Sequence, residues 1–192
     1  MKTTNIMIVG VGGQGSLLAS NLLGTLLVEQ GLDVKVSEVH GMSQRGGSVV
    51  TYVRFGEKVY SPVIDKGEAD YIVSFEMLEA ARWLPYLKSR GRVILSTQRI
   101  DPMPVITGAA AYPDALIEKI KATGALVDAV DALKLAQRAG SVRAANIVLM
   151  GRLSTYFNMP LEAWENALKE CIPPRYLDLN KEAFKLGRNA NN

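Results

Sequence analysis

The chain has 192 residues, of which 48% are hydrophobic and 21% charged. This balance is that of a globular protein with a real core, so it excludes a disordered chain, and the length suits a single domain over residues 1–192. The formal net charge of +3 is too weak to indicate a nucleic-acid partner.

Cys171 is the one cysteine and His40 the one histidine. An internal disulfide is therefore impossible, and an iron–sulfur cluster or a zinc ion bound by this chain alone is not expected, because both need several thiolate or imidazole ligands. The N-terminus leads straight into a strand pattern without a signal peptide, and no apolar run approaches the ~18 residues of a membrane span. We expect a cytoplasmic protein without membrane contact.

The first third of the chain predicts a strand, a turn, a helix and a strand. Residues 5–9 are rich in Ile and Val, and residues 16–29 carry leucines at four-residue spacing, as in a helix that Gly31 ends. Residues 33–39 predict the second strand. Together these segments predict a βαβ unit in which the two strands are parallel neighbours.

The middle of the chain predicts alternating strands and helices. The alternation over residues 48–55 predicts a strand that a turn joins to a short returning strand over 58–62, as a β-hairpin. Strands are expected over 70–75 and 92–96, with a helix over 76–87 between them. The three prolines and the small residues of segment 100–113 predict an irregular surface connection.

The last third predicts a helix over 115–122, a strand over 125–130 and a helix over 131–139. Three further helices are expected over 142–157, 161–171 and 179–186. The fold class is therefore α/β and Rossmann-like: a mostly parallel sheet flanked by helices, with a β-hairpin after the second strand and a helical C-terminal part over 141–192.

The glycine turn GVGGQG lies between the first predicted strand and the first predicted helix. Gly10, Gly12 and Gly15 form the GxGxxG pattern, which permits a tight turn and a close approach of the backbone to an anion at the helix N-terminus. Gln14 offers a side-chain amide as a further donor. The alternative is that these glycines only let the helix pack closely on the sheet.

Three kinds of ligand could place a phosphate at this turn. Glu38 lies where a dinucleotide-binding fold carries its ribose-binding acid, which keeps an NAD(P)-binding protein in view. The turn also resembles that of ubiquitin-activating-type adenylating enzymes, although the single cysteine argues against their structural zinc. The third possibility comes from a family resemblance.

The glycine turn and the segment SEVHGMSQRGGSVVTYVRFGEKVYSP, residues 37–62, together resemble the gamma subunit or domain of 2-oxoacid:ferredoxin oxidoreductases. Within that family the likeness is greatest to the small (beta) subunit of the indolepyruvate type. It extends to ADYIVSFEMLEAARWLPYL, NIVLMGRL and LNKEAFKLGR, and so covers nearly the whole chain.

The resemblance implies a subunit of a larger enzyme. Such enzymes decarboxylate a 2-oxoacid on thiamine diphosphate, reduce ferredoxin through iron–sulfur clusters and release the acyl group as its coenzyme A thioester. Thiamine diphosphate, magnesium and the clusters would lie on a large alpha subunit. This chain would carry no catalytic residue and no metal, would be inactive alone, and when isolated could form a homodimer.

The candidate site is a coenzyme A site made of two glycine-rich loops at the carboxyl edge of the sheet. The residues expected to contact the coenzyme are Gly10, Gly12, Gly13, Gln14, Gly15, Ser43, Gln44, Arg45, Gly46 and Gly47. A salt bridge is the alternative role of Arg45. Structural or packing roles are expected for the remaining candidates, namely His40, Met42, Trp83, Met103, Asn146, Trp164 and Cys171. The alternatives are a proton donor near the partner's thiamine site for His40, a cleft-facing side chain for Asn146, and an interface for Met42 and Met103.

Overall fold

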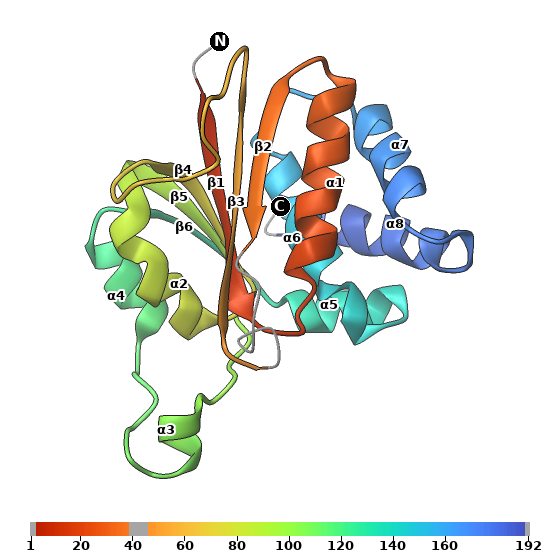
Figure 1. Ribbon diagram of the computed structural model, residues 1–192. Helices are drawn as coiled ribbons and strands as arrows, with labels where there is room; N and C mark the ends of the chain where they lie inside the picture. The colour runs from red at the N-terminus through yellow and green to blue at the C-terminus, as the bar shows by residue number, and fades with distance from the viewer. Residues whose placement is uncertain (1–2, 39–45, 191–192) are drawn as a thin grey trace.

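A six-stranded sheet forms the centre of the computed structural model, which describes residues 3–38 and 46–190 (Figure 1). The strand order is β2-β3-β1-β4-β5-β6. The bounds are β1 Thr4–Val11, β2 Asp33–Glu38, β3 Ser48–Gly56, β4 Ala69–Ser74, β5 Leu87–Ser96 and β6 Leu126–Val130.

Among these six described strands, β3 alone runs against the others. It pairs antiparallel with β1 on one side and with β2 on the other, whereas the pairs β1–β4, β4–β5 and β5–β6 are parallel. The prediction of a mostly parallel sheet is confirmed. The prediction that the first two strands are neighbours is wrong, because β3 lies between them.

The predicted hairpin between residues 48–55 and 58–62 is also wrong. Residues 57–68, all described, form no strand. β3 instead pairs with β1 on one side and with β2 on the other, and its residues Val53 and Phe55 are buried. The returning segment instead carries Pro62 and Tyr60, whose side chain is 89% exposed.

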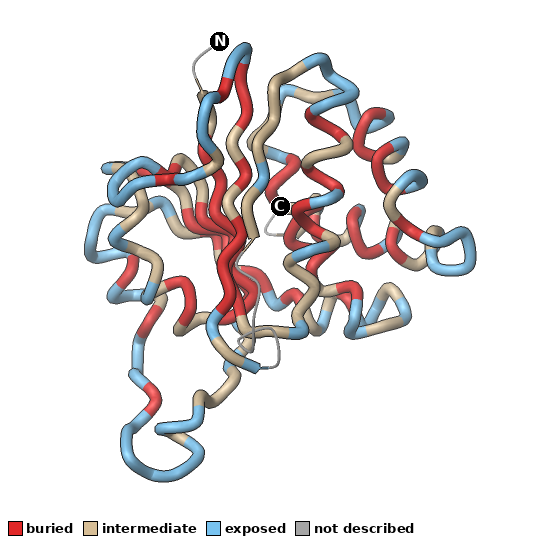
Figure 2. Tube along the Cα trace, viewed as in Figure 1, coloured by how far each residue is buried: buried red, intermediate tan, exposed pale blue. Residues whose placement is uncertain are grey.

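Helices cover both faces of the sheet. Figure 1 shows α2 and α4 on one face and α1, α5, α6, α7 and α8 on the other. The bounds are α1 Ser16–Glu29, α2 Met77–Trp83, α3 Met103–Ile106, α4 Leu116–Ala122, α5 Ala132–Ala139, α6 Ala145–Ser154, α7 Leu161–Cys171 and α8 Pro174–Arg188, with 3₁₀ turns η2 Leu84–Tyr86 and η3 Val142–Ala144. The buried residues concentrate along the strands and the inner helix faces (Figure 2).

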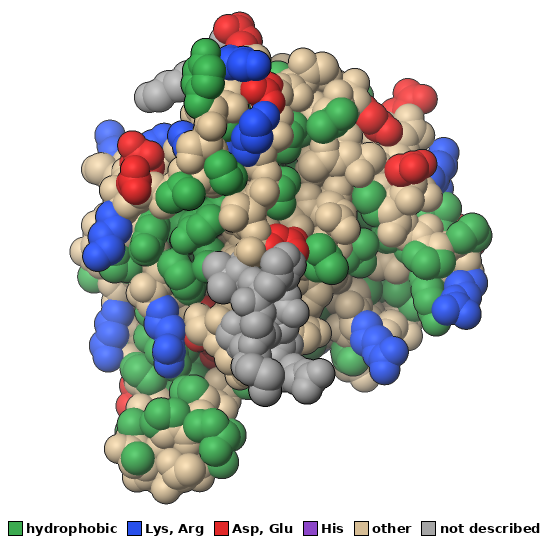
Figure 3. Space-filling view, viewed as in Figure 1, with side chains coloured by type: hydrophobic (Ala, Val, Ile, Leu, Met, Phe, Trp, Pro, Cys, Tyr) green, Lys and Arg blue, Asp and Glu red, His purple; other side chains and the backbone are tan. Residues whose placement is uncertain are grey.

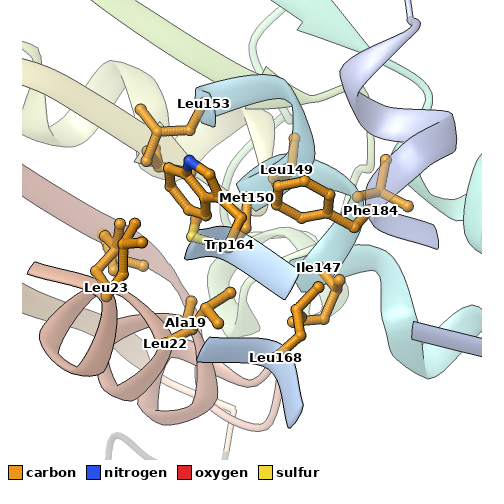
Figure 4. Packing of buried hydrophobic residues seen from close by; sticks show 14 of the residues in the cluster. Ala19, Leu22, Leu23, Ile147, Leu149, Met150, Leu153, Trp164, Leu168 and Phe184 are labelled. Atoms are coloured by element: carbon orange, nitrogen blue, oxygen red, sulfur yellow. The ribbon is translucent and has the colours of Figure 1, made fainter. Parts of the chain in front are cut away.

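The helical C-terminal part packs on α1 through a large apolar cluster. Trp164 is fully buried in it and lies 5.5 Å, centroid to centroid, from the ring of Phe184. Figure 4 shows the indole beside Leu153 and Met150, with Leu22 and Leu23 of α1 nearby. The packing role predicted for Trp164 is confirmed.

Glycines set the distance between α6 and α8. A Cβ built on Gly151 would lie 2.0 Å from the carbonyl oxygen of Phe184, and one built on Gly187 would lie 1.9 Å from the carbonyl oxygen of Val148. The two helix backbones therefore touch directly at these positions. Only hydrogen fits there.

The segment predicted as an irregular connection includes the short helix α3, which lies on an arm that extends from the body of the molecule (Figure 1). In the described ranges, no helix combines the length and the apolar character needed to cross a membrane.

Candidate functional site at the glycine turn

The glycine turn connects the carboxyl end of β1 to the first turn of α1. Gly13 and Gly15 have φ values of 98° and 88°, in the left-handed region that favours glycine. The amide of Gly12 donates to the carbonyl oxygen of Gly47 over 2.8 Å, so the start of β3 and the turn are joined. Gly47, at the described end of the second predicted loop, therefore lies against the glycine turn, and it belongs to the segment that enters the antiparallel neighbour of β1.

Close packing explains two of the glycines. A Cβ on Gly10 would lie 3.1 Å from the Cβ of Phe75, and one on Gly15 would lie 2.5 Å from the side-chain nitrogen of Asn146. The packing reading of the glycine pattern therefore accounts for these two positions. Gly13 has open space around it among the described residues, so packing does not account for Gly13.

Gln14 is a structural part of the turn. Its side-chain oxygen accepts a hydrogen bond from the Val11 amide at 2.7 Å, and its side-chain nitrogen donates to the carbonyl of Phe75 and to the side chain of Gln98, each at 3.0 Å. Both amide protons are therefore used inside the protein. Gln14 therefore stabilises the shape of the turn. Its side-chain amide is not free to donate to a ligand, so any donors to a ligand at this turn are backbone N–H groups.

The N-terminus of α1 faces the cleft without a side-chain cap among the described residues, and its first turn carries no acidic residue. The first backbone N–H groups of a helix have no partner within the helix, and together they carry a partial positive charge. Gly15, at the N-cap position, supplies no side-chain oxygen to satisfy them. The helix end is therefore suited to an anionic group.

A cleft of about 500 Å³ opens beside the turn. Gly13, Gln14 and Gly15 form one wall, and the others come from the ends of β4 and β5, from α5, and from η3 and α6. The further lining residues are Phe75, Ser96, Gln98, Leu133, Val142, Arg143, Ala145, Asn146 and Leu149.

Arg143 brings a positive charge to this cleft. It lies in η3, is exposed, and takes part in none of the ion pairs recorded for the described residues. The sequence reading missed it, because it belongs to no motif and lies some 130 residues from the glycine turn along the chain. Only the packing of α6 against α1 brings it there.

Asn146 lines the cleft and joins α6 to the glycine turn. Its side-chain oxygen accepts a hydrogen bond from the amide of Ile147 at 2.9 Å, and its side-chain nitrogen donates to the carbonyl of Gly15 at 3.2 Å. The capping role expected for it is not observed, because the N-cap position of α6 is Ala144, which has no side-chain cap, and Asn146 lies inside the helix. The second bond instead ties α6 to the glycine turn.

Part of the predicted site lies outside the described residues: Ser43, Gln44 and Arg45, together with His40 and Met42. Gly46 is described and has a φ of 99°, as expected for a glycine loop. Gly47 contributes its carbonyl to Gly12.

Two buried glutamates lie next to these loops. Glu79 accepts a short hydrogen bond from the hydroxyl of Ser48, the residue that follows Gly47, and burial raises the pKa of its carboxyl. Arg82, whose guanidinium lies 3.3 Å from Glu79, partly opposes this shift. Glu76, at the N-cap of α2, is 1% exposed.

Glu38 lies at the end of β2, which is not a neighbour of β1, the strand that leads into the glycine turn. Its carboxylate accepts a hydrogen bond of 2.7 Å from Ser20 on α1, and β3 separates its strand from β1. In a dinucleotide fold, the strand that carries the ribose-binding acid adjoins the first strand. The sheet order therefore argues against that use of Glu38.

A larger cleft, of about 700 Å³, lies at the opposite edge of the sheet. Two of its three cations have partners: Lys88 pairs with Asp70 at 2.6 Å, and the Arg92 guanidinium lies 4.1 Å from the ring centre of Tyr156. Within residues 3–38 and 46–190 no group of three or more potential metal-binding side chains is found.

The family model described as pyruvate ferredoxin/flavodoxin oxidoreductase matches residues 5–190. The chain belongs to this oxidoreductase family. Among curated relatives, the indolepyruvate oxidoreductase subunit IorB of Thermococcus kodakarensis is 46% identical over 97% of this chain and 95% of its own length. The common gamma subunit of the pyruvate/ketoisovalerate oxidoreductases of Pyrococcus abyssi is 24% identical over 92% of this chain and 90% of its own.

Solved structures of the family share the fold. The pyruvate oxidoreductase subunit PORC of Thermotoga maritima superposes with a TM-score of 0.74 at 21% identity, covering 97% of this chain and 96% of its own. The 2-oxoglutarate:ferredoxin oxidoreductase of Magnetococcus marinus, solved with 2-oxoglutarate, coenzyme A and succinyl-CoA, gives 0.76 at 21% identity, covering 98% of this chain and 31% of that longer chain. The family resemblance and the α/β fold predicted from the sequence are confirmed.

Proposed function

We propose that this chain is the small subunit of a 2-oxoacid:ferredoxin oxidoreductase of the indolepyruvate type, and that the cleft at the glycine turn binds a phosphate of coenzyme A. The large partner subunit would carry thiamine diphosphate, magnesium and the iron–sulfur clusters and would pass electrons to ferredoxin. Thiamine diphosphate supplies the carbanion chemistry of decarboxylation. This chain would complete the active site and would be inactive alone.

One observation supports the coenzyme assignment most: the uncapped N-terminus of α1, the left-handed glycines Gly13 and Gly15, and the exposed Arg143 border one cleft. A phosphate there would accept hydrogen bonds from backbone N–H groups and from a planar guanidinium, which suits phosphate geometry. The apolar lining, with Phe75, Leu133 and Leu149, suits the non-charged parts of the ligand.

The subunit assignment draws support from relatives that are 46% identical over nearly the whole chain and are named indolepyruvate oxidoreductase subunits. The choice of 2-oxoacid depends on side chains of the large partner subunit. Ser43, Gln44 and Arg45, which lie outside the described residues, stay part of the prediction.

Steady-state kinetics of the co-expressed two-subunit enzyme test the coenzyme site. Replacing Arg143 by Ala should raise the KM for coenzyme A roughly 10- to 150-fold, since a charge-assisted hydrogen bond contributes about 1.5–3 kcal/mol. The KM for the 2-oxoacid should stay unchanged. Arg90→Ala, an exposed arginine at the opposite end of β5, is the matched control and should behave as the wild type.

Hydrogen exchange separates binding from scaffolding. Coenzyme A should protect the amides of residues 12–15 in the assembled enzyme, whereas NAD and NADP should not. Protection of these amides by a dinucleotide, or an unchanged KM for coenzyme A in the Arg143 variant, would contradict the proposed coenzyme A site. Oxidoreductase turnover by the isolated chain would refute the subunit assignment.

A further inference from the structure

An arm formed by residues 99–113 extends from the body between β5 and α4 (Figure 1). It leaves the sheet just after the carboxyl end of β5, which is the edge that carries the glycine turn. Figure 3 shows hydrophobic side chains, among backbone and other uncharged side chains, on its surface. The glycine-turn cleft and the arm therefore share one side of the molecule.

A single buried carboxylate holds both ends of the arm. One oxygen of Glu76 accepts hydrogen bonds from the amide of Ile100 at 3.2 Å and from the hydroxyl of Tyr112 at 2.5 Å. The guanidinium of Arg99 lies 4.3 Å from the ring centre of Tyr112 and pairs with Asp101 at 2.6 Å. The base of the arm is therefore fixed in place.

The tip of the arm is ordered by its own backbone. The amide of Val105 donates to the carbonyl of Pro102, that of Thr107 to Met103 and that of Ala110 to Pro104, all at 2.9 Å. An arm held in this way loses little conformational entropy when it binds a partner. Its shape is preorganised.

The surface of the tip is apolar and uncharged. The side chains of Met103 and Ile106 are each 66% exposed, and the sequence has no charged residue between Asp101 and Asp114. Apolar side chains gathered on a protruding element mark an interaction site, and depletion of charge is typical of the core of an interface. The tip lacks the charges that a polar partner surface would need.

We propose that this arm is a docking element that inserts Met103 and Ile106 into an apolar recess of the large, thiamine-diphosphate-carrying subunit. The inference rests on the proposed function. Two observations favour that occupant over a second copy of this chain. The arm lies on the same side as the cleft in which coenzyme A must meet the large subunit's reaction centre, and the same fold in the Magnetococcus marinus enzyme is 31% of a longer chain.

Co-purification tests the arm. The large subunit from the same genome is co-expressed with the wild-type small chain, with the double variant Met103→Asp/Ile106→Asp, or with Tyr60→Asp. Tyr60 is the matched control, because it is 89% exposed and follows β3 at the opposite edge of the sheet. The double variant should retain the wild-type Tm, since both side chains point into solvent, but should lose at least tenfold in affinity for the large subunit.

A photo-crosslinking amino acid at position 103 supplies an independent readout. It should crosslink to the large subunit, whereas the same group at position 60 should not. Equal co-purification of the double variant, or a crosslink from position 103 to a second small chain, would overturn the arm's role while leaving the subunit assignment intact. Failure of the wild-type chain to co-purify would instead overturn the proposed function.

Discussion

The side-chain nitrogen of Gln14 donates a hydrogen bond to the side-chain oxygen of Gln98 over 3.0 Å. Gln14 shapes the glycine turn, and Gln98 follows β5 at the foot of the arm. The backbone carbonyl of Gln98 also accepts from the amide of Met77, the first residue of α2. The cleft and the arm are therefore built on one hydrogen-bonded base, so docking through the arm can fix the geometry of the turn.

The Glu76–Tyr112 hydrogen bond should contribute measurably to stability. Tyr112→Phe leaves the buried carboxylate with one donor fewer, and we expect a loss of about 1.5–3 kcal/mol in the free energy of unfolding. Urea denaturation measures it. The control is Tyr60→Phe, whose hydroxyl lies on an 89% exposed side chain and whose loss should change stability little. Equal losses of stability in the two variants would contradict this role of the Glu76–Tyr112 hydrogen bond.

Gly15 should tolerate alanine less well than Gly13. Both have left-handed φ values, so each substitution costs about 1–2 kcal/mol in backbone strain. Gly15→Ala adds a Cβ 2.5 Å from the side chain of Asn146, whereas a Cβ at Gly13 meets open space among the described residues. Thermal unfolding should give a lower Tm for Gly15→Ala. The double variant Gly15→Ala/Asn146→Ala should recover part of the added loss, and full additivity would argue against the contact.

The contact of α6 with α8 predicts a severe effect of a single methyl group. Gly151→Ala and Gly187→Ala place a Cβ about 2 Å from a backbone carbonyl of the facing helix, and neither backbone can yield without moving a helix. We expect each to cost about 3 kcal/mol or to prevent folding. Gly24→Ala in α1 is the control. Its Cβ meets nothing among the described residues, so it should stabilise the protein by about 0.8–1.0 kcal/mol.

Glu79 should make stability depend on pH. Burial raises the pKa of its carboxyl above the ordinary 4.5, so the folded protein holds the proton more tightly than the unfolded chain. The associated free energy of unfolding is fully present below pH 4.5 and is lost as the pH rises through the raised pKa. Glu79→Gln should therefore be more stable than the wild type at neutral pH, with no difference below pH 4.5. Glu118→Gln, on an exposed helix position, should show neither effect.

Local patterns predicted most of the elements. The leucine spacing of residues 16–29 gave the bounds of α1, and Gly31 and Gly140 end helices with φ values of 75° and 115°, as glycines at helix ends do. The arm was predicted as an irregular surface connection, and α3 within it has only four residues. Pairing between strands was less accessible, because alternation tells which face a residue occupies but not which strand lies beside it.

The candidate site was likewise only partly predictable from local patterns in the sequence. The glycine turn was found because its spacing, between a strand and a helix, has a local cause. Arg143 and Gln98 lie far along the chain from the turn and belong to no pattern, so no local signal could place them there. The structural role of Gln14 was not predicted, because the groups that accept its hydrogen bonds, on Phe75 and Gln98, are remote in sequence.

The sequence by itself determined the family, the α/β class and the position of the glycine turn, because short-range spacing and turn chemistry encode them. Only the tertiary structure decided that β3 separates β1 from β2, that Arg143 borders the cleft, and that one carboxylate holds both ends of the arm. The reason is that these relationships depend on which buried surfaces meet. Such pairings are set by the packing of the whole chain.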